Sequence, residues 1–180
     1  MRRLLAIALL FASGCSFFSK SKSTIYSLDP IAPAAPLAKR GAAVAIDSVE
    51  LPPGLDRREI VVRKANQQLE IRANELWPAN LQPLVLHALA FDLAKRLPEG
   101  MVVLPGESRP AAAPRAIDVA FEDLTAGPEK RVTLDARWTL AGAPHHERLA
   151  IDLQSLDSGA VATGISQAVA ALADRIAAGM

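Results

Sequence analysis

Three successive segments in the C-terminal half alternate strictly between apolar and polar residues, and this alternation constrains the fold more than any other feature. The apolar positions are Ile117, Val119 and Phe121, then Val132, Leu134, Ala136, Trp138 and Leu140, then Leu149, Ile151 and Leu153. Because successive side chains of a β-strand point to opposite faces, each segment predicts a strand with one apolar face. The connecting residues Gly127-Pro128 and Ala141-Gly142 are typical of turns, so they favour an antiparallel meander.

Two other segments carry apolar residues at helical spacing. Leu81 to Leu97 and Val161 to Ile176 each place them at steps of three and four, which predicts a helix with one apolar stripe. Burying one Leu, Ile or Val side chain contributes about 1.5–3 kcal/mol, so the stripes and the sheet should pack together. The pattern therefore predicts an α+β fold, a two-layer sandwich of a mostly antiparallel sheet with two long helices on one face.

The rest of the chain predicts shorter strands. Residues 44–49 form a strand-like segment, and residues 60–63 and 68–72 form a hairpin around a turn at 65–67. Residues 24–28 and 101–104 each predict a short strand.

The N-terminus has the composition of an export signal. Arg2 and Arg3 precede an apolar run from Leu4 to Ala12, and Ser13-Gly14-Cys15 follows. The run is about half the roughly 20 residues that a membrane-spanning helix needs, so a permanent transmembrane anchor is not expected. Small residues directly before a Cys resemble the bacterial lipobox, in which the Cys is diacylated and becomes the new N-terminus after cleavage at Gly14. An ordinary secretory signal that contains a Cys is the alternative.

These features divide the chain into three parts. Residues 1–14 are the predicted lipoprotein signal peptide, residues 15–41 carry the lipidated Cys15 and an extended tether with a short strand, and residues 42–180 form the α+β domain. Ser16 follows the Cys, where enteric lipoproteins retained in the inner membrane have Asp. By this resemblance we expect a lipid-anchored protein on the periplasmic face of the outer membrane.

Composition and motifs argue against several classes of function. The 20 Lys and Arg residues nearly balance 19 Asp and Glu residues and are scattered, which argues against nucleic-acid binding. A single Cys excludes a disulfide framework. His145 and His146 fall in a predicted turn. If they lay on a strand instead, their side chains would point to opposite faces, so they could not readily bind one metal ion together. His87 falls on the first helix, and neither a Gly-x-Ser-x-Gly elbow nor a nucleotide-binding loop is present. We therefore expect no catalytic set, no cofactor and no metal.

Several motifs in the right order resemble one family. The run from Val49 to Arg63, which reads VELPPGLDRREIVVR, is similar to a hairpin motif of the ABC-type transport auxiliary lipoproteins, the PqiC-like family. The segment ELWPANL at 75–81 resembles the family's Trp-containing entry to its first long helix, and IYSLDP at 25–30 resembles its Tyr-x-Leu segment after the lipidated Cys.

This resemblance implies a non-enzymatic component of an MCE-type lipid transport system between the two membranes. The implied partners are an MCE-domain transport protein and its inner-membrane permease and ATPase, with the membrane reached through the lipid anchor. Two alternatives stay open. One is a periplasmic carrier that encloses an acyl chain between sheet and helices in a cavity of roughly 300 Å³ or more. The other is a structural lipoprotein of another envelope assembly, which forms a ring or another homo-oligomer through exposed sheet edges.

Four residues are candidates for a partner surface. Arg57, Arg58 and Arg63 lie on the charged first hairpin, where they either dock a partner or keep an edge strand solvated. Trp77 is a candidate partner-facing aromatic residue, although core packing is the favoured interpretation for both Trp77 and Trp138.

Overall fold

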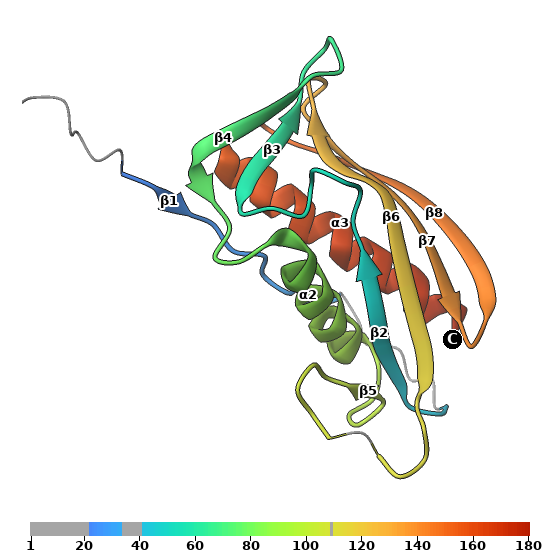
Figure 1. Cartoon of the computed structure of the whole chain (residues 1–180). Helices are drawn as coiled ribbons and strands as arrows, with labels where there is room; N and C mark the ends of the chain where they lie inside the picture. The colour runs from blue at the N-terminus through green and yellow to red at the C-terminus, as the bar shows by residue number, and fades with distance from the viewer. Residues whose placement is uncertain (1–21, 34–40, 109) are drawn as a thin grey trace, which may run out of the picture.

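The computed structural model describes residues 22–33, 41–108 and 110–180. Within these ranges the chain forms two layers, an eight-stranded sheet and two long helices along one of its faces (Figure 1). The elements in chain order are β1 (Thr24–Ile25), β2 (Val44–Glu50), β3 (Glu59–Arg63), β4 (Leu69–Leu76), α2 (Leu81–Arg96), β5 (Val102–Val103), β6 (Arg115–Gly127), β7 (Arg131–Leu140), β8 (Ala143–Asp152) and α3 (Ser158–Gly179). The predicted α+β fold with two long helices on one sheet face is confirmed.

The sheet is mixed, which corrects the prediction of a mostly antiparallel one. In the part of the chain that the structure describes, four strand pairs are parallel: β1 with β4, β2 with β5, β2 with β6, and β3 with β6. Alternation along one segment shows that it is a strand, but it does not show which distant strand lies beside it. Here β2 runs parallel to β6 because the chain between them returns through the β3–β4 hairpin and α2.

The antiparallel parts of the sheet agree with the sequence. The β3–β4 hairpin forms around a turn in which the Lys64 N–H donates to the Gln68 carbonyl at 2.8 Å. Strands β6, β7 and β8 form the predicted meander. Between β7 and β8, Ala141 and Gly142 have φ angles of 50° and 85°, as a two-residue hairpin turn of the I′ type requires.

The core lies between the layers. Apolar faces of β6 and β7 meet the stripes of α2 and α3, and the residues in this contact that are fully buried include Val85, Leu89, Leu93, Ile117, Leu134, Leu172 and Ile176. At Gly164, a Cβ atom would lie 2.4 Å from Leu153 and 2.9 Å from Val132, so the missing side chain lets α3 approach the sheet. Within the described residues, neither helix is long and apolar enough to span a membrane.

Candidate functional site

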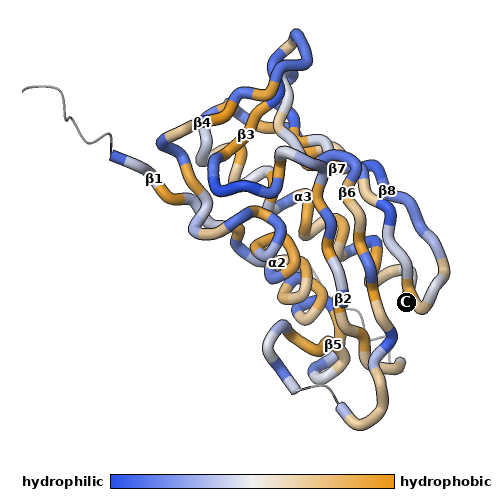
Figure 2. Tube along the Cα trace, viewed as in Figure 1, coloured by the Kyte–Doolittle hydropathy of each residue, from blue (hydrophilic) through white to orange (hydrophobic). Residues whose placement is uncertain are grey.

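The three arginines predicted to meet a partner do not form one patch. Arg57 and Arg58 precede β3 in a strongly hydrophilic loop, and Arg63 is the last residue of that five-residue strand (Figure 2). Arg57 Nε pairs with Glu59 at 3.0 Å, and this hydrogen bond lowers the pKa of the Glu59 carboxyl. Arg63 donates two hydrogen bonds of 3.0 Å to the two carboxylate oxygens of Asp123 on β6. Because a strand rises about 3.3 Å per residue, the two ends of β3 are separated by about 13 Å.

Trp77 lies in the core. Its side chain is 1% exposed, and its backbone N–H donates to the Arg58 carbonyl at 2.6 Å. Trp138 is 2% exposed, so the core-packing interpretation holds for both tryptophans. A partner cannot reach the Trp77 side chain in this structure.

The segment that begins with β1 contacts both helices, and we call residues 24–33 the strap. The Tyr26 N–H donates to the Leu76 carbonyl at 2.8 Å, the Asp29 N–H to Ser166 Oγ on α3 at 3.2 Å, and the Ile31 N–H to Asp92 Oδ1 on α2 at 2.6 Å. The sequence predicted an extended tether with a short strand over residues 15–41. The structure limits the strand to Thr24–Ile25 and adds that Tyr26, Asp29 and Ile31 are hydrogen-bonded to the sheet and the helices.

A buried polar network holds the end of the strap. Arg96, with its side chain 3% exposed, donates from Nη1 to the Ile31 carbonyl at 2.9 Å, and it pairs through Nε with Asp174 on α3 at 2.6 Å. Asp92 lies 3.5 Å from Arg96, and its Oδ2 is buried without a hydrogen-bond partner in the described chain. Desolvation outweighs the hydrogen bond from Ile31 and the nearby cations, and it raises the pKa of Asp92 to about 6.

The raised pKa of Asp92 predicts a pH dependence of stability. The folded state binds a proton at Asp92 more tightly than the unfolded state, so this group's contribution is fully present below about pH 4 and falls as the pH rises to about 6. We expect Asp92→Asn, which keeps an acceptor for the Ile31 N–H, to remove this decline, so that the difference in unfolding free energy between variant and wild type grows by roughly 1–3 kcal/mol over that interval. Urea unfolding at several pH values measures it, and a constant difference would contradict the assignment.

The two adjacent histidines do not lie in a turn, as the sequence predicted, but their side chains do point to opposite faces. They lie inside β8 and not in a turn, because the two-residue turn at 141–142 allows the strand to begin at Ala143. As expected for successive strand residues, their side chains diverge. His145 stacks on Trp138 with ring centroids 3.8 Å apart, whereas His146 lies beside Asp135 on the other face.

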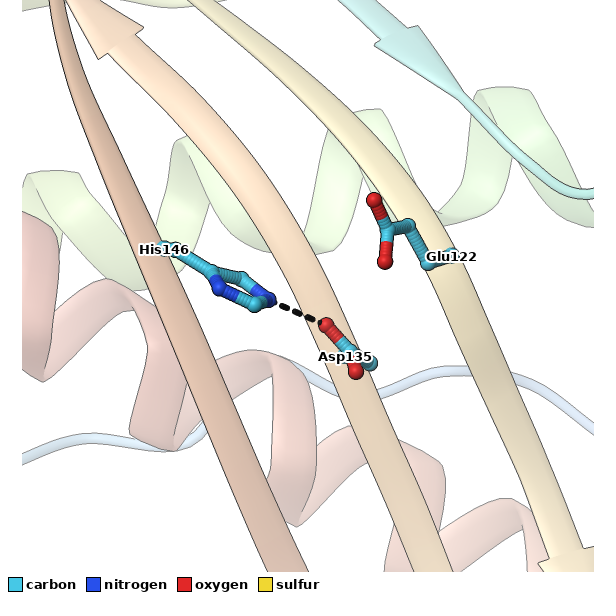
Figure 3. Close-up of side chains that lie close together, drawn as sticks. All are labelled: Glu122, Asp135 and His146. Atoms are coloured by element: carbon cyan, nitrogen blue, oxygen red, sulfur yellow. Dashed lines mark hydrogen bonds and ion pairs between the residues drawn. The ribbon is translucent and has the colours of Figure 1, made fainter.

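On the sheet face away from the helices, His146 meets carboxylates from two other strands. Glu122 of β6, Asp135 of β7 and His146 of β8 place possible metal-ligand atoms within 4.8 Å of one another (Figure 3). However, Asp135 already accepts from His146 and from Arg148, each at 2.6 Å, and Glu122 accepts from Arg137 at 2.5 Å. The hydrogen bond from His146 and the charge of Arg148 lower the pKa of Asp135. The group is therefore built as a network of ion pairs and hydrogen bonds across the meander, centred on the Asp135 carboxylate.

Sequence reasoning missed this network and the one around Asp92. The residues of the first become neighbours only through the register of β6, β7 and β8. In that register Asp135 lies opposite Arg148, and Glu122 lies at the register shift next to Asp123, the β6 partner of Asp135. The signal for the second was weak but present, since Asp92 and Arg96 interrupt the otherwise apolar stripe of the first helix at helical spacing.

Comparison with known proteins agrees with this architecture. Residues 26–177 match the family model described as the ABC-type transport auxiliary lipoprotein component. The chain belongs to this family. The resemblance that its LPPGL and Trp-containing motifs carried is thereby confirmed. A search of the curated proteins finds no match.

Solved structures share the fold at low sequence identity. One, described as an uncharacterized protein, has a TM-score of 0.71 and 19% identity, covering 88% of this chain and 98% of its own. Protein XCC0632 from Xanthomonas campestris, of family DUF330, has a TM-score of 0.64 and 15% identity, covering 86% of this chain and 93% of its own. The likeness extends over both layers.

Proposed function

We propose that this transport auxiliary lipoprotein is anchored in the outer membrane and works in the periplasm as a non-enzymatic component of an MCE-type lipid transport system. The observation that carries the proposal is the family match, which extends over residues 26–177 and so begins shortly after the predicted export signal and Cys15. An MCE-domain protein, with its permease and ATPase in the inner membrane, is the partner that the family resemblance supports.

The anchor is the part of the proposal that depends on Cys15, which lies outside the described residues. Several acyl chains on one Cys would hold the protein firmly, because each buried CH₂ contributes about 0.8 kcal/mol. Ser16 supports delivery to the outer membrane.

Packing between the layers favours docking over lipid carriage. A small cavity there, lined in part by Leu55, Trp77 and Ile165, has a volume of about 10 Å³. An acyl-chain site needs roughly 300 Å³ or more. A larger hollow of about 510 Å³ lies over β2, β6, β7 and β8 and is open to solvent. Among the described residues β8 pairs with β7 alone, so its other edge is open to a partner or to a second copy.

The test is the mass and the membrane association of the full-length protein, compared with a Cys15→Ala variant. We expect the extracted wild-type protein to have the mass of the chain without residues 1–14 plus acyl groups, to float with outer membranes, and to co-purify with an MCE-domain protein of the same cells. The variant should lose the acyl mass and the membrane fraction. An unmodified, soluble wild-type protein would refute the anchor, and a lipidated protein that never co-purifies with an MCE-domain protein would refute the transport role.

A further inference from the structure

Three large apolar side chains are exposed in the described part of the chain, and all lie on two neighbouring strands. Ile25 of β1 is 62% exposed, and Leu69 and Ile71 of β4 are 45% and 47% exposed. A soluble surface tolerates isolated apolar residues, but three on adjoining strands form a local apolar patch.

The register places the three side chains on one face. Leu69 and Ile71 alternate along β4 with Glu70 and Arg72. Arg72 donates to Ser158 Oγ and to the Leu156 carbonyl beside the start of α3, so Leu69 and Ile71 point away from that helix.

Ile25 joins this face through its pairing. It lies opposite Leu76. Glu75 is hydrogen-bonded to Arg72 and Ser158 beside the start of α3, so the next residue, Leu76, and its partner Ile25 point away from that helix, as Ile71 does. We call Ile25, Leu69 and Ile71 the β1–β4 patch.

The chain that leads to Cys15 leaves the domain next to this patch. Eight residues lie between Cys15 and Thr24, and these nine residue steps keep the Cys within about 30 Å of β1. Thr24 pairs with Glu75, and Ile71 lies four residues from Glu75, or about 13 Å along β4. The strap is bonded to both helices, so the tether starts at β1 and not elsewhere on the surface (Figure 1).

We propose that the β1–β4 patch contacts the lipid surface in which Cys15 is anchored. This inference depends on the proposed lipidation. The anchor keeps the patch at high effective concentration near the bilayer, so modest apolar contacts suffice to orient the domain. The β7–β8 turn, which lies at the other end of the molecule from β1, then points into the periplasm toward a transport partner (Figure 1).

A site-specific quenching experiment on the full, lipidated chain tests this orientation. Acylation blocks the thiol of Cys15, so a single new cysteine can carry a fluorophore, either in Ile71→Cys or in the control Ala143→Cys, which is exposed beside the β7–β8 turn. The proteins are reconstituted into vesicles of phosphatidylethanolamine and phosphatidylglycerol that contain a quencher on the acyl chains. We expect quenching at position 71 to exceed that at 143 by about three-fold or more, since only the former site would lie at the bilayer.

A second variant ties the effect to the patch. Leu69→Ser in the Ile71→Cys background should reduce the quenching at position 71 by about half, while far-UV circular dichroism stays unchanged because the residue is exposed. If labelled protein floats with the vesicles but positions 71 and 143 are quenched equally, the membrane contact is wrong and the anchor stands. If the protein does not float with the vesicles at all, the proposed lipidation and the function that depends on it are wrong.

Discussion

Arg96→Ala should lower the free energy of unfolding by about 3–5 kcal/mol, because removing one partner of a buried ion pair leaves the other charge without compensation. Arg96 is 2% exposed and binds the strap carbonyl of Ile31, the Asp92 carbonyl and the Asp174 carboxylate. Its loss removes the one side chain among these that joins the strap to α2 and to α3 at the same time. Urea unfolding at pH 7 measures the effect.

Two further variants make the expectation specific to the buried network. Arg175→Ala removes an exposed arginine of α3 that lies 3.8 Å from Glu147, and it should cost less than about 1 kcal/mol. Adding Asp92→Asn to Arg96→Ala should restore part of the lost stability, because the unpaired buried charge then disappears. Equal costs for Arg96→Ala and Arg175→Ala would show that the network does not hold the strap.

Trp77→Ala should cost about 3–5 kcal/mol of unfolding free energy, as large-to-small substitutions of buried aromatic residues do. The side chain is 1% exposed beside Leu55, Leu81 and Leu124, and the cavity already present there is small. The substitution would therefore leave a void that tightly packed neighbours cannot fill. Chemical denaturation of both proteins provides the measurement.

A conservative variant separates packing from partner recognition. Trp77→Phe keeps much of the apolar volume, so it should cost clearly less than Trp77→Ala. If instead both variants unfold like the wild type and only co-purification with a transport partner is lost, Trp77 is a partner-facing residue and the core assignment is wrong.

The contacts between the strap and the helices also bear on the proposed lipid anchor. A lipid anchor alone would leave the domain free to rotate about a flexible tether. Hydrogen bonds from the strap to Ser166 and Asp92, and from Lys95 and Arg96 to the strap carbonyls, make its end a fixed part of the domain. Under the proposed anchoring, weakening that contact should therefore loosen the domain's orientation at the membrane as well as its stability.

The sequence by itself determined the elements and their faces. Alternation at Val132, Leu134 and Ala136 and helical spacing in residues 81–97 and 161–176 are local patterns, because a side chain's direction depends on backbone geometry within a few residues. The meander, the β3–β4 hairpin and both helices follow from such patterns together with turn residues such as Gly142. The family likeness was visible for the same reason, since its motifs are short and follow one order.

Only the tertiary structure decided which of these elements lie together. The parallel pairing of β2 with β6 joins Val49 to Val119, seventy residues apart, and no local pattern encodes it. No local pattern encodes the ion pair of Arg96 with Asp174 or those of Asp135 either. From sequence alone, a charged residue on a strand or helix is expected to face solvent, and only the tertiary structure shows which element packs against it. The β1–β4 patch likewise exists because the short β1 pairs with the end of β4, a contact that brings the start of the tether to exposed apolar residues.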